Sequence, residues 1–286
     1  MYKYTDIAPF FKDWEINYDY IKTLPNEPKL YINGASEHYG DGILETLADQ
    51  VGNHAVLSHY HHAKLVFHPY WYHWAKDNWP KTYKAIISSD RKTYQMSCLN
   101  NSSHSHRIIN WYSIRKLNNC LVLMRNDPIN NLNNIILTEQ ECQRWDLDRQ
   151  HLKLRQENSQ QGIRVDADIL HDAYTDSYVN LVTETVTCPK IFLTEKTWKP
   201  IASGQLFLVL GNPGIIEHLR EQGIDCFDDV IDHSYDAIVD TRERMAYMHT
   251  SLNTLLKQDL FQINMATKQR RTKNAELFWS QKLYEL

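Results

Sequence analysis

One stretch of the chain, FLTEKTWKPIASGQLFLVLGNPG at residues 192–214, combines charged side chains with the pattern of a loop, a helix, a strand and a second loop. A helix is expected from Thr197 until Gly204 ends it, and an apolar strand follows. Lys196 then stands at the helix N-terminus, where backbone N–H groups and the positive end of the helix dipole favour a phosphate. The stretch therefore predicts phosphate binding. The alternative is that Glu195 and Lys196 only cap a solvated helix start.

A second stretch, SHYHHAKLVFHPYWYHWAKDNW at residues 58–79, is dense in histidine and aromatic side chains. No carboxylate or cysteine follows His59-x-His61 at the spacing of metal ligands, so we expect no metal site there. Core packing explains part of the aromatic density. The remaining side chains are candidates for stacking on a sugar or base and for hydrogen bonding to it; they are His68, Trp71, His73 and Trp74.

Short apolar runs bounded by polar turns recur along the chain, as is typical of buried parallel strands. They are KLYIN at 29–33, HAVLS at 54–58, KLVFH at 64–68, CLVLM at 120–124 and LFLVL at 206–210. Stretches with helical spacing separate them, and this alternation indicates an α/β fold. At this length we expect two Rossmann-like domains that face a cleft, residues 1–90 and 91–286, with C-terminal helices that pack back onto the second.

The composition narrows the class of protein. Of 286 residues, 42% are hydrophobic and 23% are charged, which favours a soluble globular chain. The formal charge of -4 gives no general attraction to nucleic acid, although a local basic groove is compatible with it. The five cysteines are scattered, without a C-x-x-C pair, and the N-terminus has no apolar stretch like that of a signal peptide. Since no long apolar run occurs either, we expect a protein of the reducing cytoplasm that does not enter membranes.

Residues 192–214 resemble the donor-binding motif of the alpha-1,3-fucosyltransferase family. In that family a tyrosine-valine-threonine-glutamate-lysine run precedes a helix and a hydrophobic strand that ends in glycine, and the run here is Phe192 to Lys196. The resemblance implies a GT-B-like glycosyltransferase with a nucleotide-sugar donor.

Two upstream blocks resemble the same family and stand in the family's order. In residues 92–117, Arg107 matches an arginine at the start of a helix. In YVNLVTET at 178–185, Glu184 matches the glutamate of a phenylalanine-glutamate-asparagine-serine strand. The resemblance covers about the region from Lys92 to Gly214 and does not extend to residues 1–90.

The resemblance implies roles for individual residues. Arg107 and Lys196 become the cations on the diphosphate, and Glu195 becomes the carboxylate on the ribose hydroxyls. Glu184 and Asn101 complete the donor-binding set. Fixed cations stabilise the charge that builds on the diphosphate as the sugar leaves, so neither a metal nor another cofactor is expected.

Departures from the family pattern leave the donor open between GDP- and UDP-linked sugars. Cys98 and Asn100-Asn101 stand in place of a serine-asparagine pair, and Thr183-Glu184-Thr185 replaces the phenylalanine-glutamate-asparagine run. Two D-x-D patterns, at 146–148 and 166–168, are similar to the metal-binding pair of the other glycosyltransferase fold. Both lie in polar segments without a flanking apolar strand, so we expect them to be solvated.

Transfer with inversion, which the resemblance implies, needs a base that takes a proton from the acceptor hydroxyl. The candidates are Glu37 and Asp41 in NGASEHYGDG, because this loop follows an apolar strand and therefore lies at its carboxyl end. His38 and His73 are reserves, and an ordinary polar turn is the alternative interpretation of the loop.

The sequence thus predicts transfer of a sugar to a hydroxyl acceptor, which is a glycan or a modified nucleic-acid base. The alternative is a non-catalytic nucleotide-binding module that acts through interactions. The two differ in whether a carboxylate or histidine from residues 1–90 reaches the acceptor hydroxyl.

Overall fold

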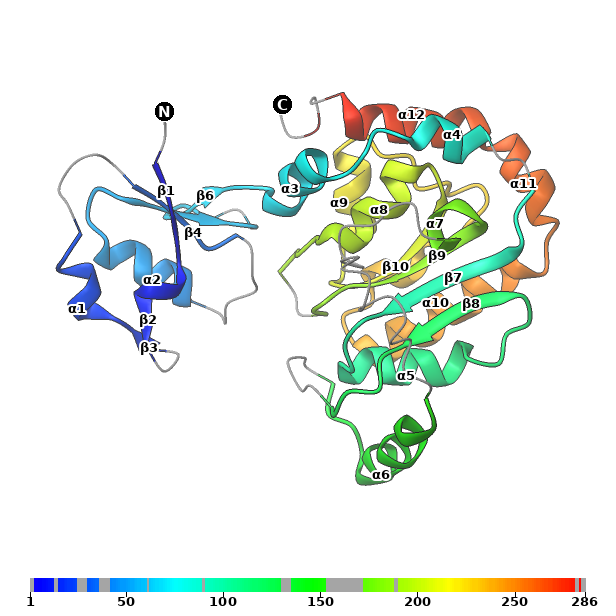
Figure 1. The fold of residues 1–286 in the computed structure, drawn as a ribbon, viewed down its shortest axis with the longest axis horizontal. Coiled ribbons are helices and arrows are strands. Elements are labelled where there is room, and N and C mark those ends of the chain that lie inside the picture. The colour runs from blue at the N-terminus through cyan, green and yellow to red at the C-terminus, as the bar shows by residue number, and fades with distance from the viewer. Residues whose placement is uncertain are drawn as a thin grey trace. The chain divides into compact units, whose positions relative to one another are not determined.

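The computed structural model describes residues 3–12, 15–24, 30–35, 42–60, 62–88, 91–129, 135–152, 172–187, 190–280 and 283. The chain forms two compact units, Met1–Trp74 and Ala75–Leu286. Each contains a parallel sheet with helices, which confirms the α/β class (Figure 1). Within the described ranges, no helix has both the length and the apolar character needed to cross a bilayer.

The division between the units precedes the boundary expected near residue 90. Helix α3 (Tyr70–Asn78) crosses it, and α4 (Tyr83–Ser88) packs against α8 (Glu195–Ser203) and α12 (Lys268–Trp279) of the second unit. The packing is aromatic, because the Tyr83 ring stacks on Trp279 at a centroid distance of 6.2 Å. Residues 75–88 therefore belong with the second unit.

The first unit contains a four-stranded parallel sheet. Its strands β1 (Lys3–Asp6), β4 (Leu30–Asn33), β5 (Ala55–Ser58) and β6 (Val66–Phe67) lie side by side in chain order. Three of the predicted apolar runs form β4, β5 and β6. The other elements are η1 (Ala8–Phe10), the antiparallel pair β2 (Phe11–Lys12) and β3 (Glu15–Ile16), α1 (Tyr18–Ile21) and α2 (Ile43–Gln50).

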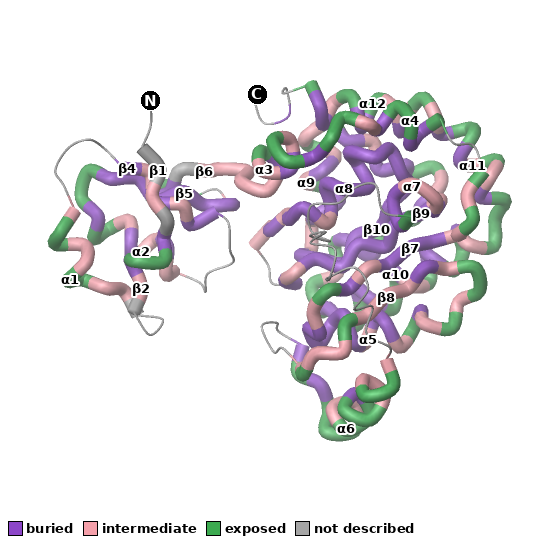
Figure 2. Tube along the Cα trace, in the orientation of Figure 1, coloured by how far each residue is buried: buried purple, intermediate pink, exposed green. Residues whose placement is uncertain are grey.

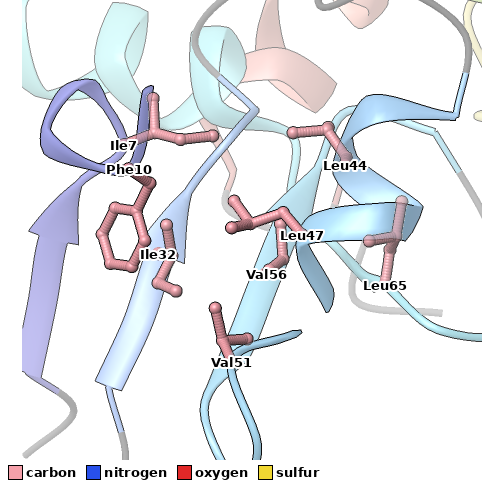
Figure 3. Packing of buried hydrophobic residues seen from close by; sticks show 8 residues of the cluster. All are labelled: Ile7, Phe10, Ile32, Leu44, Leu47, Val51, Val56 and Leu65. Carbon is pink, nitrogen blue, oxygen red and sulfur yellow. The ribbon is translucent and has the colours of Figure 1, made fainter. Parts of the chain in front are cut away.

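The core of the first unit lies between its sheet and α2. Leu44 and Leu47 occupy one face of α2 at a spacing of three residues, and both are fully buried. They pack with Ile32 of β4 and Val56 of β5, as Figure 3 shows. The same cluster contains Ile7, Phe10, Val51 and Leu65.

The second unit contains another parallel sheet, and its strand order reverses. Its strands are β7 (Tyr94–Asn100), β8 (Cys120–Met124), β9 (Ser177–Thr183) and β10 (Leu206–Leu210). The spatial order is β10-β9-β7-β8, so β8 lies on one side of β7 and β9 on the other. In open α/β sheets, ligands bind at the carboxyl ends of the strands at such a switch point.

Helices cover both faces of this sheet (Figure 1). α5 (Ser105–Ile114) and α10 (Thr241–Leu256) lie on one face, and α4, α7 (Asp172–Thr175), α8 and α12 lie on the other. The purple trace of β9, β10 and α8 in Figure 2 shows how fully this sandwich buries them. The remaining elements are α6 (Glu139–Asp148), η2 (Arg149–His151), α9 (Ile215–Glu221), η3 (Ser234–Ala237) and α11 (Leu260–Ala266).

Replacing Gly204 by alanine should destabilise the second unit strongly. Gly204 ends α8 with φ +67°, and a Cβ there would collide with Ile87 Cδ1 and lie 2.5 Å from its Cγ1. Gly214 has a similar φ of +81°, but its nearest neighbour would be 4.0 Å away. Gly204→Ala should therefore cost about 2 to 4 kcal/mol of unfolding free energy, and Gly214→Ala about 1 kcal/mol.

Urea unfolding of the two variants measures this difference. Equal losses of unfolding free energy would mean that only the backbone strain at positive φ destabilises the variants. In that case Ile87 of α4 would shift to make room for the added Cβ without a measurable loss of stability.

Candidate functional site

The side chains at the switch point join the ends of β7 and β9. Asn100 is the last residue of β7 and Thr183 the last of β9, and both are buried. The Thr183 hydroxyl donates to Asn100 Oδ1, and Asn100 Nδ2 donates to Cys98 Sγ at 3.4 Å. Asn101, which the resemblance assigns to the donor site, is exposed. Of the two neighbouring asparagines, Asn100 is therefore the one whose amide is fixed by hydrogen bonds at this edge of the sheet.

Glu184 follows β9 directly and is fully buried. Its Oε1 accepts from Thr194 N at 3.0 Å and Thr197 Oγ1 at 2.6 Å. Its Oε2 accepts from Thr194 Oγ1 at 2.6 Å and Thr185 N at 3.3 Å. Both carboxylate oxygens are thus used inside the protein, where they hold the first turn of α8 against β9. This places Glu184 as a positioning residue for the loop that carries Glu195 and Lys196.

A glycine is required opposite this carboxylate. A Cβ on Gly211, at the end of β10, would lie 3.3 Å from both Cβ and Cγ of Glu184 and 2.8 Å from Ile215 Cδ1. The close approach of the two chain segments leaves Glu184 dry, which strengthens its hydrogen bonds.

Lys196 lies in the first turn of α8, as the sequence predicts. The helix begins at Glu195, earlier than expected, because Thr194 is the N-cap and accepts from Lys196 N. Lys196 Nζ lies 3.0 Å from Glu195 Oε1, 3.1 Å from Thr194 Oγ1 and 3.2 Å from Thr185 Oγ1. Its side chain is 26% exposed against 9% for Glu195, so Lys196 is the more exposed residue of the pair.

Glu195 stays ionised beneath that ammonium. Burial acts to raise the pKa of its carboxyl group, but the positive charges of Lys196 and Lys199 outweigh burial and hold the pKa below its ordinary value. An anion next to the N-terminus of α8 is also favoured by the helix dipole.

Arg107 lies in α5 and is 2% exposed. Its Nη2 donates to the Thr183 carbonyl at 3.1 Å, and its Nε has no hydrogen-bond partner among the described residues. Burial lowers the pKa of Arg107 to about 10, against the attraction of Glu184 and Glu195, so it is charged at neutral pH. The charges of Glu184 and Glu195 act on Arg107, and those of Lys196 and Lys199 act on Glu195, so these residues form one group of interacting charges.

Arg244 is a buried neighbour of this site that the sequence analysis did not identify. It lies in α10, 1% exposed, and donates from Nη2 to the Gly211 carbonyl at 2.9 Å and the Thr187 carbonyl at 3.3 Å. It thereby ties together the chain segments that leave β9 and β10. Its side chain shares the buried face of α10 with Met245 and Met248. This position on the buried face is the signal that the sequence offered for Arg244. A buried arginine among core methionines needs hydrogen-bond acceptors inside the protein.

The predicted acceptor-side residues lie in the first unit, within or just before α3. Trp71 and Trp74 are partly buried, with ring centroids 5.5 Å apart and planes at 70°. The rings of His68 and His73 stack at 5.3 Å. Tyr72 on the same helix is buried, so the aromatic stretch divides into a core face and a partly accessible face. The predicted bases Glu37 and Asp41, and the reserve His38, lie outside the described residues.

The D-x-D pattern at 146–148 forms ion pairs on α6. Asp146 lies 2.8 Å from Arg149, and Asp148 lies 3.3 Å from Arg115. Residues 166–168 lie outside the described part of the chain. In the part that is described, no group of three or more histidine, cysteine, aspartate or glutamate side chains is arranged to hold a metal ion.

Comparison of the chain with protein-family models, with curated proteins and with solved structures found no match. The resemblance to fucosyltransferases therefore stays a hypothesis.

Glu184→Gln should destabilise the second unit. The amide replaces one acceptor oxygen by an NH2 group, which cannot accept from the threonine donors around it. Since hydrogen bonds to a charged group are worth about 1.5 to 3 kcal/mol each, we expect the unfolding free energy to fall by at least that amount. Glu217→Gln on α9 is the matched control, because Glu217 is 63% exposed and pairs only with Arg220 among the described residues.

Chemical denaturation of both variants tests this role. Equal stability of Glu184→Gln and Glu217→Gln would show that the buried carboxylate does not hold α8.

His68 should make the stability of the protein depend on pH. Burial, with the nearby His73, lowers the pKa of His68 to about 4 from the ordinary 6.5. The unfolded chain therefore binds a proton more readily than the folded one, so this contribution is complete above pH 6.5 and is lost as pH falls towards 4. His68→Gln should flatten the loss of stability between pH 6.5 and 4, measured by urea unfolding at several pH values. An unchanged pH slope would contradict this assignment.

Proposed function

We propose that the protein is a glycosyltransferase of the two-domain GT-B type, which uses a nucleotide-sugar donor. The observation that carries this proposal is the partly exposed side chain of Lys196 on the first turn of α8, at the switch point of the second sheet. Backbone N–H groups, the helix dipole and this cation together favour an anion such as a diphosphate. Buried Arg107 adds a second, fixed positive charge behind it.

This arrangement suits a leaving diphosphate better than a permanently bound anion. Negative charge grows on the diphosphate as the bond to the sugar breaks, and preorganised cations stabilise that charge without reorganising. Glu184 and its threonine partners supply the preorganisation, because they fix the backbone that carries Lys196. Glu195 is assigned to the ribose hydroxyls, as the resemblance implies.

The acceptor side is assigned to the first unit, with Trp71, Trp74, His68 and His73 as its aromatic and polar contacts. In the proposed reaction, Glu37 or Asp41 takes the proton of an acceptor hydroxyl. The hydroxyl oxygen bonds to the anomeric carbon while the carbon–oxygen bond to the diphosphate breaks, and the nucleoside diphosphate leaves. The donor is a GDP- or UDP-linked sugar, and the acceptor is a glycan or a modified nucleic-acid base. The proposed transfer uses no metal.

A hydrolysis and transfer assay across nucleotide sugars separates this proposal from a binding module without activity. Turnover that is lost in Glu37→Gln or in Asp41→Asn, with nucleotide binding retained, supports transfer with that residue as the base. Binding of nucleotide without any turnover would overturn the proposal in favour of the module.

Lys196→Ala should weaken the binding of a nucleoside diphosphate by about 10-fold to 150-fold, because a charge-assisted contact is worth about 1.5 to 3 kcal/mol. Lys273→Ala is the control, since Lys273 is an exposed lysine on α12. Glu195→Gln should reduce affinity for a nucleoside diphosphate and leave pyrophosphate binding nearly intact. Calorimetry on variants with normal melting temperatures measures all three. Equal affinities for Lys196→Ala and Lys273→Ala would remove the basis of the proposal.

A further inference from the structure

A pocket of about 570 Å³ opens at the same edge of the second sheet. Its walls come from the chain after β9, the chain after β10, the segment before α6 and the start of α10. The lining residues that bear on its ligand are Ile136, Thr187, Pro213, Val239, Asp240 and Arg242. We infer that this pocket binds the heterocyclic base of the nucleotide, an inference that rests on the proposed function for its link to the diphosphate.

The rim of the pocket is apolar and unusually accessible. Ile136 is 87% exposed and Val239 is 71% exposed, and both line the pocket with Pro213. A single exposed aliphatic side chain is ordinary, but two at the mouth of one pocket form a surface that a flat ring would cover. The volume also lies in the range of about 300 to 1,000 Å³ that is usual for small-molecule sites.

Thr187 provides an unused hydrogen-bonding group in the wall. It is 3% exposed, and its hydroxyl has no hydrogen-bond partner among the described residues. Its carbonyl is held by Arg244 Nη2 at 3.3 Å, so the backbone of the residue is fixed. A buried hydroxyl without a partner is costly, and the polar edge of a base would satisfy it.

The charges around the pocket do not suit a phosphate. Arg242 donates to both carboxylate oxygens of Glu141, at 3.0 and 2.9 Å, and to the Ile136 carbonyl at 3.1 Å. The hydrogen bond from Arg242, opposed by partial burial, lowers the pKa of Glu141 to about 2, so this ion pair persists at neutral pH. The pair neutralises the guanidinium and ties the Ile136 wall to α10.

Asp240 leaves a negative charge at this wall. Its Oδ1 caps α10 by accepting from Glu243 N at 2.8 Å. A carboxylate only accepts hydrogen bonds, so the edge of the ligand must donate N–H groups. An amino group offers two N–H donors, whereas uracil in a nucleotide offers only its ring N3–H, so this wall favours guanine, adenine or cytosine over uracil.

The pocket and Lys196 are linked through the chain that leaves β9. Lys196 Nζ contacts Thr185 Oγ1 at 3.2 Å. Thr187, which lines the pocket, follows two residues later, so the Cα atoms of Thr185 and Thr187 are at most about 7 Å apart. Arg244 holds Thr187 and Gly211 together, and Gly211 packs against Glu184. The pocket and the cation site therefore share one rigid frame.

Calorimetry of the full chain with GDP, ADP, CDP, UDP and pyrophosphate tests the inference. We expect Thr187→Val and Val239→Asp to weaken the preferred nucleoside diphosphate by about 5-fold to 50-fold and to leave pyrophosphate affinity unchanged. Asp240→Asn preserves the helix cap but should reduce the preference for amino-bearing bases over UDP. Thr254→Val, at an exposed position on α10, is the control.

Val239 is mostly exposed, so Val239→Asp keeps the test decisive even if Thr187→Val fails to fold. If Lys196→Ala weakens binding while the Thr187 and Val239 variants bind as the wild type does, the inference is overturned and the proposed function stands. If the pocket variants lose guanosine or adenosine binding while Lys196→Ala has no effect on any ligand, the pocket stands and the proposed function fails. Absence of nucleotide and nucleoside binding to the wild-type chain overturns both.

Discussion

The architecture of the site depends on one buried carboxylate. Glu184 stands at the end of β9 without access to water, and it is tolerable there because four donors satisfy its two oxygens. Three of the four come from Thr194 and Thr197, so the same hydrogen bonds that satisfy the charge also fix the start of α8. A buried carboxylate with a full set of donors rigidifies its surroundings, whereas a partly satisfied one would destabilise them.

The fixed first turn of α8 holds Glu195 and Lys196 at the edge of the second sheet. The reversal of strand order between β7 and β9 opens the carboxyl edge, and α8 presents its N-terminus there. Arg107 and Lys196 bring positive charge to this edge, although the whole chain carries a formal charge of -4.

The neighbouring pocket depends on the same frame through Arg244. Its guanidinium joins the carbonyls of Thr187 and Gly211, and Gly211 touches Glu184. A cationic edge and a mostly apolar pocket beside it are the two environments that a nucleotide combines, a charged diphosphate and a flat ring. Arg242 pairs with Glu141 at the pocket, and Lys196 pairs with Glu195 at the start of α8.

The sequence by itself determined the features that local patterns control. The apolar runs became β4, β5, β6, β8 and β10, Gly204 ended α8, and Lys196 lay in the first turn of that helix. These follow from side-chain periodicity, burial and the conformational freedom of glycine, which act over a few residues.

Only the tertiary structure decided which residues meet. Asn100 is buried and bonded to Thr183 while Asn101 is exposed, Glu184 holds the start of α8, and Arg244 links two strand ends from a distant helix. Residues 75–88 joined the second unit because aromatic partners near the C-terminus cover them. Each of these outcomes depends on contacts between segments far apart in the chain, where strand order and helix packing set the distance and local propensity carries no information.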